Sequence, residues 1–280
     1  MKRIRSAAVP STQPADLFVH EAGHAVIAWE LGVKITELYF SPKVWLGRMT
    51  FIGGVVTFQG DRASERAREA AEKDMLIFHA GLMAQRLFHY DSACGHSSMD
   101  VKGLMDTAQM VEDDVDLIDA WSDYIEERVR VMLCRPETWH RVIALAPEIA
   151  RRLYLRGEDI ASFLDHLDVG QAVSPQERGL NRAEYAFGKA IDVLALSNRT
   201  RGCLDRAEIA TIAELLTRSA ADLRGEVWHA GAKTVAEVEA ALAMLGLRLA
   251  EEPRFEREWR VQQARREAHC GEETTRRGWR

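Results

Sequence analysis

Several features that would place this 280-residue chain in a specialised class are absent. The four cysteines are scattered and form no C-x-x-C pair, so reduced thiols are favoured over a disulfide framework or a cysteine-based zinc site. No apolar run approaches the roughly 20 residues that a membrane helix requires. The basic N-terminus is followed by no apolar signal segment. We therefore expect a cytoplasmic protein without membrane contact.

The overall charge and the phosphate-binding motifs likewise indicate no specialised class. The net charge is −6, which gives no overall indication of binding to nucleic acid or to an acidic membrane. No G-x-x-x-x-G-K-[ST] phosphate loop occurs. An apolar fraction of 47% with 29% charged residues is typical of a globular protein, and the length allows two modest domains.

Helical periodicity dominates the first 167 residues, with two short strand-like segments. The predicted elements are a helix over 15–31, strands over 33–40 and 53–60, helices over 62–89 and 98–133, and a helical stretch to about residue 167 broken at Pro136, Pro147 and Gly157. We therefore expect a mainly α (α+β) fold with a small β element.

The composition changes after residue 168. Residues 169–185 combine glycine, proline, serine and charge, which predicts a linker. Residues 186–250 form several short helical segments and predict a small all-α domain. Residues 251–280 are rich in arginine and glutamate, so we expect a charged tail that is a solvated helix or disordered. The first domain is predicted to span residues 12–168.

The segment HEAGH at residues 20–24 is the most specific chemical motif of the first domain. His20 and His24 lie on one helix face, so both imidazoles can bind a single ion. Glu21 lies beside them and can take a proton from a metal-bound water. The alternative is a buried helix with two ordinary core histidines, but burying these groups without partners is costly. We therefore predict a Zn²⁺ site that needs a third protein ligand.

The candidates for that ligand are His79, His89, His96, Asp100 and Asp106. An ordinary core or surface histidine is the favoured interpretation of His79 and His89. Asp100 is near the start of a predicted helix, where an acidic residue also suits the helix dipole. Residue physics alone leaves the choice between His96 and Asp100 open.

Three segments, HEAGHAVIAW, HAGLMAQRLFHY and SSMDVKGLMDTAQMV, resemble the peptidase domain of the FtsH family of ATP-dependent zinc metalloproteases. The resemblance covers about residues 12–168 and implies a helical, zincin-like fold. It assigns Asp100 as the third zinc ligand beside His20 and His24, with Glu21 as the general base. It thereby implies a metalloendopeptidase in which zinc-activated water attacks a peptide bond.

The same resemblance implies partners. The substrate would be a polypeptide, accepted by strand addition along the strand near residues 54–58. The sequence encodes no ATPase, so a separate ATPase motor would deliver folded substrates. FtsH proteases form hexamers, which makes an oligomer an expectation here as well.

A second resemblance covers about residues 190–250. The segments GCL, IATIAEL, SAADL, GAKT and LGLRL occur in the order found in the C-terminal domain of the bacterial RNA polymerase α subunit. That resemblance implies DNA contact through Arg199, Arg201, Gly231 and Lys233, or contact with polymerase. Acidic and basic side chains are equal in number in residues 186–250, so a protein-docking domain is the alternative.

Two hypotheses follow from these features. The leading one is a zinc-dependent metalloendopeptidase without its own motor that carries a DNA- or polymerase-docking module. The alternative is a non-enzymatic, transcription-associated adaptor or DNA-binding protein whose zinc site is structural or vestigial.

Overall fold

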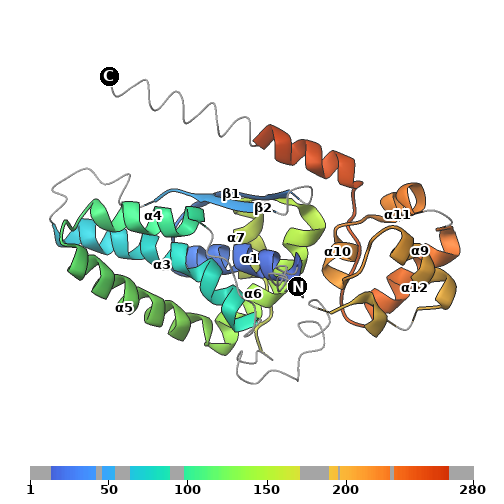
Figure 1. Ribbon diagram of the computed structural model, residues 1–280, viewed down its shortest axis with the longest axis horizontal. Helices are drawn as coiled ribbons and strands as arrows, with labels where there is room; N and C mark the ends of the chain where they lie inside the picture. The colour runs from blue at the N-terminus through green and yellow to red at the C-terminus, as the bar shows by residue number, and fades with distance from the viewer. Residues whose placement is uncertain are drawn as a thin grey trace, which may run out of the picture.

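The computed structural model describes residues 14–41, 46–53, 64–88, 98–170, 189–194, 196–227 and 230–264. These residues are mainly helical and include one small sheet (Figure 1). The predicted mainly α class with a small β element is confirmed. None of the described helices has the length and apolarity needed to cross a membrane.

The protein forms two helical units, which we call the N-terminal part (residues 14–165) and the C-terminal module (residues 189–250). The N-terminal part consists of α1 (Pro14–Glu30), β1 (Ile35–Ser41), β2 (Leu46–Phe51), α3 (Glu65–Phe88), α4 (Ser98–Gln109), α5 (Val115–Leu133), α6 (Pro136–Arg152), β3 (Tyr154–Arg156) and α7 (Gly157–Asp165). The C-terminal module consists of η2 (Ile191–Val193), α9 (Asn198–Arg206), α10 (Ile212–Leu216), α11 (Ala220–Glu226) and α12 (Ala232–Ala243). A further helix covers residues 254–264.

Helix α1 is the centre of the N-terminal part and packs against α3 and α6 (Figure 1). Its apolar side chains are buried on every side, as the absence of a polar face predicts. Gly23 lets α3 approach closely, because a Cβ at this position would lie 2.6 Å from the Ala80 carbonyl oxygen and from Ala84 Cβ. This close contact sets the distance between the two helices that carry most of the candidate site.

The sheet has the strand order β2-β1-β3, and both pairs are antiparallel. The strand predicted over residues 33–40 corresponds to β1. Its hairpin partner is β2 at 46–51, not the predicted 53–60, of which residues 54–60 lie outside the described part. The pairing with β1 decides where β2 lies in the sequence. Met49 lies opposite Leu38 of β1, and both Met49 and Phe51 pack on the core.

Helix α6 continues through Pro147, so the predicted break at this proline is wrong. Proline costs a helix interior about 3 kcal/mol in isolation. The buried stripe of Val142, Leu145, Ala146 and Ile149 offsets that cost by fixing α6 against the core.

The helix predicted over 98–133 is instead two helices, α4 and α5. Asp114 caps α5, because its side chain accepts hydrogen bonds from the backbone N–H groups of Asp116 and Leu117. Aspartate is a favoured N-cap residue. The acidic run that contains it was the sequence signal for this boundary.

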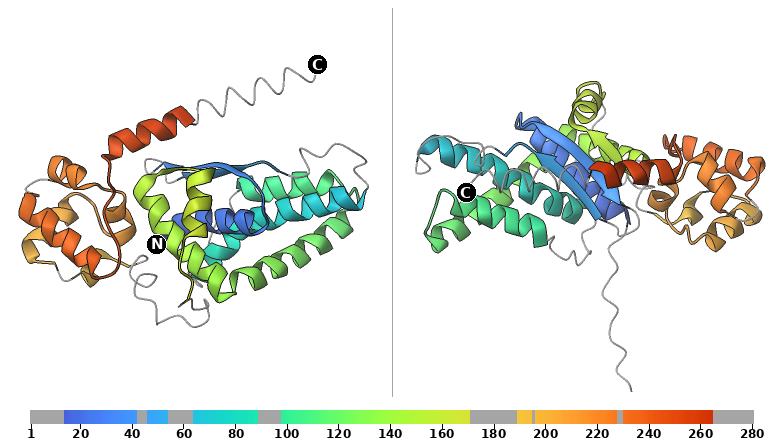
Figure 2. Two further views of the ribbon diagram at one scale, coloured as in Figure 1. Left: turned by 180° about the vertical axis from the view of Figure 1, so that it is seen from behind. Right: turned by 90° about the horizontal axis from the view of Figure 1, so that it is seen from above.

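The C-terminal module lies beside one end of the N-terminal part, and helix 254–264 runs back from the module toward the sheet (Figures 1 and 2). Helix α10 contacts α6 and α1. One cluster of buried apolar side chains extends from the N-terminal part into the module. The two units are therefore packed together across a seam.

Arg257 closes this seam from helix 254–264. It is only 1% exposed. Its guanidinium donates hydrogen bonds to the carbonyl oxygens of Arg151 (2.9 Å) in α6, Thr217 (2.5 Å) in the module, and Glu252 (2.9 Å). Burial lowers the pKa of Arg257 to about 10, against the opposing effect of Asp222, so the guanidinium is charged at neutral pH. Part of the segment predicted as a charged tail thus joins the two units, while residues 265–280 lie outside the described part.

We predict that Arg257→Ala lowers the free energy of unfolding by about 2–4 kcal/mol, because three carbonyl groups, two of them in buried hydrogen bonds, lose a charged donor. Urea unfolding of the full-length protein measures this change. The matched control is Arg260→Ala on the same helix, whose side chain is 41% exposed and whose loss should cost below about 1 kcal/mol. Equal effects of the two substitutions would contradict the structural role of Arg257.

Candidate functional site

His20 and His24 of α1 meet Asp100 of α4 in the N-terminal part. The two Nε2 atoms are 3.0 Å apart. Asp100 places Oδ2 2.9 Å from His20 Nε2 and Oδ1 3.6 Å from His24 Nε2. Among the described residues, these three form the one group of histidine, cysteine and acidic side chains arranged to hold a metal ion. We call these three residues the metal cluster.

The ring of His24 is held by α3. Its Nδ1 lies 2.6 Å from the Ile77 carbonyl oxygen, so Nδ1–H donates and Nε2 is left to face His20 and Asp100. A hydrogen bond from the second ring nitrogen to a carbonyl is the usual way in which proteins orient a ligating histidine. This contact depends on the close approach of α1 and α3 at Gly23.

The donor set fits Zn²⁺. Two imidazole nitrogens bound to one tetrahedral zinc at about 2.0–2.1 Å are roughly 3.3 Å apart, close to the 3.0 Å between the two Nε2 atoms. Glu21 Oε2 is buried and, within the described part of the protein, has no hydrogen-bond partner. Unpaired buried polar atoms are costly, and a metal with bound water would relieve this one.

Two glycines lie in close contact with the side chains of the site, Gly81 with the two imidazoles and Gly47 with Glu21. A Cβ at Gly81 of α3 would lie 2.7 Å from His20 Nε2 and closer still to His24 Nε2. A Cβ at Gly47 of β2 would lie 2.5 Å from Glu21 Cδ. Sequence reasoning noted Gly81 only as part of a resemblance and missed Gly47. Neither role has a signal in the residue pattern alone, because both depend on contacts between distant elements.

The electrostatics of the metal cluster follow from its burial. Desolvation raises the pKa of Glu21, although both histidines oppose this shift. Burial lowers the pKa of His24, but Asp100 and Glu21 outweigh it and raise that pKa to about 9. Burial likewise opposes ionisation of Asp100, yet the two histidines hold its pKa far below the usual value. Without a metal, His24 therefore tends to hold a proton, and this proton takes the place of the positive charge that a metal ion would supply.

The other ligand candidates are placed elsewhere or not described. His79 Nε2 lies 3.3 Å from Ser122 Oγ of α5, and Asp106 is exposed on α4. His89 and His96 lie outside the described residues. The structure thus brings Asp100, rather than His79 or Asp106, to the two histidines of α1.

The residues predicted to contact DNA lie at two adjacent helix starts in the C-terminal module. Arg199 is on the first turn of α9. Gly231 is the N-cap of α12, and Lys233 is the second residue of that helix. Glu237, one turn beyond Lys233, accepts hydrogen bonds from the Ser197 hydroxyl (2.9 Å), the Ser197 N–H and the Thr200 hydroxyl. This carboxylate joins the two helix starts.

Three of the four predicted contact residues are open to solvent. Arg199, Gly231 and Lys233 are exposed, and a Cβ at Gly231 would meet nothing within 4 Å. Arg201 differs, since it is half-buried and its Nε lies 3.4 Å from Asp192 Oδ1. Glu237 is a neighbour that sequence reasoning missed, although its helical spacing from Lys233 offered a weak signal.

The C-terminal module has identifiable relatives. Residues 181–244 match the family model for the C-terminal domain of the alpha subunit of bacterial RNA polymerase. This region is similar to an RNA polymerase α C-terminal domain. The module is thereby related to a transcription protein, as the predicted resemblance over residues 190–250 implied.

Two curated proteins support this similarity. The DNA-directed RNA polymerase subunit alpha of Mycoplasma pneumoniae (strain ATCC 29342 / M129 / Subtype 1) is 39% identical over 74 residues, which are 26% of this protein and 22% of the relative. The subunit alpha of Adiantum capillus-veneris is 40% identical over 97 residues, or 32% of this protein and 28% of the relative. The protein thus spans about a quarter of the length of these relatives.

The predicted function of zinc metalloendopeptidase is wrong, because the similarities found lead to RNA polymerase α subunits and not to a protease. The FtsH resemblance of residues 12–168 receives no support, and neither do the polypeptide substrate and the ATPase motor that it implied. The physical reason lies in the motif. Two histidines four residues apart specify metal ligation, but they do not specify a reaction at the metal.

We predict that Gly81→Ala lowers the free energy of unfolding by about 1–3 kcal/mol, because the added methyl group displaces two buried imidazoles. The matched control is Gly202→Ala in α9, where a Cβ would meet nothing within 4 Å and a gain of up to about 1 kcal/mol is expected from helix propensity. Chemical denaturation of both variants measures the contrast. Similar stability changes in the two variants would contradict the close contact between Gly81 and the two imidazoles.

Proposed function

We propose that this protein is a non-enzymatic, transcription-associated adaptor that binds DNA or RNA polymerase through its C-terminal module. The observation that carries the proposal is the match of residues 181–244 to the bacterial RNA polymerase α C-terminal domain. The module is packed on the N-terminal part rather than joined only by a linker. Binding by the module would therefore hold the N-terminal part in a defined position.

DNA is the first candidate partner. The start of α12, whose N-cap Gly231 has no side-chain cap hydrogen bond, suits phosphate oxygens, and Arg199 and Lys233 add positive charge nearby. The open space at Gly231 leaves room for a close approach of a phosphate backbone. The module has no excess of positive charge, so we expect weak, salt-sensitive DNA binding.

RNA polymerase is the second candidate partner, and the charge balance of the module favours it. Equal numbers of acidic and basic groups limit phosphate neutralisation, but they suit a polar protein interface. Glu237, fixed by Ser197 and Thr200, places a negative charge beside Arg199 and Lys233. A protein surface with mixed charges can pair with such a pattern.

The N-terminal part would contribute a structural Zn²⁺ site formed by His20, His24 and Asp100. The support is the 3.0 Å between the two Nε2 atoms and the orientation of His24 by the Ile77 carbonyl. A zinc ion bound there would link α1 to α4 across the core. It would thereby stabilise the part on which the module is packed.

We predict that the full-length protein binds a DNA duplex at about 50 mM salt and loses most of that affinity at about 200 mM. Arg199→Ala should weaken binding about fivefold to tenfold and reduce the slope of log affinity against log salt by about one, because one phosphate contact is lost. Fluorescence anisotropy with a labelled duplex measures both effects.

The matched control is Arg224→Ala, since Arg224 is an exposed arginine of the same module on α11. It should leave the affinity unchanged. If no duplex binds at low salt, DNA contact is excluded and polymerase becomes the partner to test. Failure of immobilised RNA polymerase to retain the protein as well would refute the adaptor proposal.

We predict that the protein binds one Zn²⁺ per molecule and that His24→Ala abolishes this binding. Zinc at a hundredfold excess over Kd should stabilise the wild type by about 2.7 kcal/mol. Elemental analysis after dialysis and unfolding with and without zinc measure the two quantities. His79→Ala is the control, because His79 contacts Ser122 and lies outside the metal cluster. Absence of zinc from the wild type would refute the metal site and leave the DNA experiment unaffected.

A further inference from the structure

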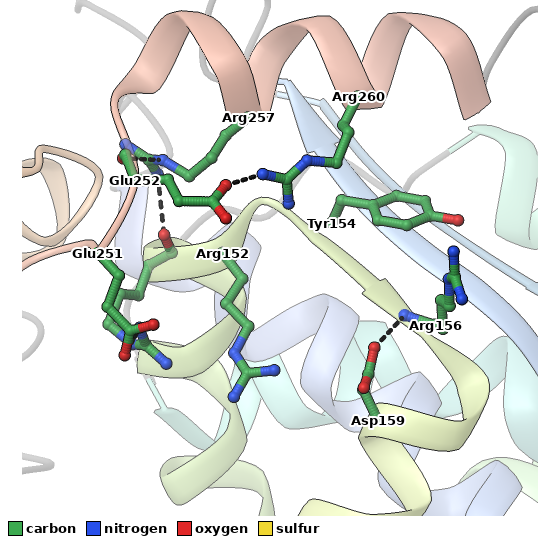
Figure 3. Close-up of a pocket in the computed structure, with 9 residues that line it drawn as sticks. Arg152, Tyr154, Arg156, Asp159, Glu251, Glu252, Arg257 and Arg260 are labelled. Atoms are coloured by element: carbon green, nitrogen blue, oxygen red, sulfur yellow. Dashed lines mark hydrogen bonds and ion pairs between the residues drawn. The ribbon is translucent and has the colours of Figure 1, made fainter.

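A cavity of about 430 Å³ lies at the seam between the N-terminal part and helix 254–264 (Figure 3). The cavity is in the range of roughly 300–1,000 Å³ that is usual for small-ligand sites. Its walls come from the end of α6, β3, the start of α7 and residues 251–260. The lining residues are Arg151, Arg152, Tyr154, Arg156, Asp159, Glu251, Glu252, Arg257 and Arg260.

Five arginines line this seam cavity, against three carboxylates. Two of the arginines are structural: Arg257 binds backbone carbonyls, and Arg151 is buried beside Glu148 (2.5 Å) and Glu251 (2.9 Å). Glu148 pairs with Arg151 and Arg152 from outside the lining. The lining itself still carries an excess of positive charge, which attracts anions in a protein with a net charge of −6.

The remaining three arginines that line the cavity are partly or fully exposed. Arg152 and Arg260 are each 41% exposed and have one carboxylate partner each, Glu148 and Glu252. Arg156 is exposed, and no carboxylate among the described residues lies within ion-pair distance of its guanidinium. Figure 3 shows Arg260 and Arg156 on two sides of the Tyr154 ring, with Arg152 extending from α6 beside Glu251.

We propose that the seam cavity binds a small phosphate ester of nucleotide size. Planar guanidinium groups bind phosphate through paired, charge-assisted hydrogen bonds, and several of them around one opening suit a multiply charged anion. Tyr154 supplies an aromatic ring beside Arg156 and Arg260 (Figure 3). Asp159 also lines the cavity and would accept a hydrogen bond from a hydroxyl or amino group of the ligand.

The position of the cavity between two segments means that a bound ligand would affect how they pack. Arg152 and Arg156 belong to the N-terminal part, whereas Arg260 belongs to the helix that carries Arg257. A phosphate ester held between Arg260 and an arginine of the N-terminal part would bridge that part and helix 254–264 and strengthen the packing of the helix. This inference requires neither DNA binding by the module nor metal at the metal cluster, so its failure would leave the proposed function untouched.

Isothermal titration calorimetry of the full-length protein with inorganic pyrophosphate, ADP and adenosine tests the site. EDTA is present throughout to exclude binding through a metal. We expect pyrophosphate and ADP to bind, ADP more tightly, and adenosine to bind at least tenfold more weakly than ADP. No heat of binding with millimolar pyrophosphate or ADP would overturn the proposal, and so would equal affinities for ADP and adenosine.

Three variants locate the site. Arg156→Gln should weaken pyrophosphate binding at least tenfold, and Arg224→Gln, the matched surface arginine, should leave it unchanged. Asp159→Asn should tighten pyrophosphate binding severalfold, since it removes a negative charge from the cavity wall while keeping a polar group at the start of α7. Equal losses with the two arginine variants, or no change with both Arg156→Gln and Asp159→Asn, would show that the anion binds elsewhere. If Arg156→Gln does not fold, the Asp159→Asn arm still decides between these outcomes.

Discussion

The contact on which the arrangement of the molecule depends is the buried guanidinium of Arg257. It donates to backbone carbonyls of α6 and of the turn after α10, and so joins one residue from each unit. Carbonyl groups at the ends of short helices need donors when they are buried. Arg257 supplies these donors from a third segment and so adds to the packing of the module that α10 and the shared apolar cluster also provide.

The second constraint is the close packing of α1 on α3. Gly23 allows the two helices to meet, the Ile77 carbonyl orients His24, and Gly81 leaves space for both imidazoles. The result is a polar cluster inside an apolar core, which a bound cation would neutralise. Such a cluster accounts for the HEAGH motif without a peptidase, since metal ligation alone can stabilise a fold. The similarity of the module to RNA polymerase α subunits is the observation on which the proposed function rests.

Much of this organisation could be predicted from the residues. The spacing of His20 and His24 predicted a shared helix face, and the order of short motifs after residue 190 predicted the relationship of the module. What could not be predicted depends on tertiary contacts. Strand β2 is chosen by its pairing with β1, and Pro147 is tolerated because α6 is buried. Helix 254–264 is held by buried Arg257, Val261 and Ala264 in a segment with few aliphatic residues. The peptidase prediction failed because it rested on the resemblance of short segments to a peptidase family, whereas the similarities found are to RNA polymerase α subunits.

The proposed function divides the tasks between the two units: the C-terminal module would make the contact, and the N-terminal part would hold it in place. Site-specific photocrosslinking tests this division most directly. A photoreactive residue is placed at position 199 or at position 224 of the full-length protein, which is then irradiated with a DNA duplex and RNA polymerase. The division predicts crosslinks to DNA or polymerase from position 199 and not from position 224. Absence of crosslinks from position 199, or equal yields from both positions, would contradict it.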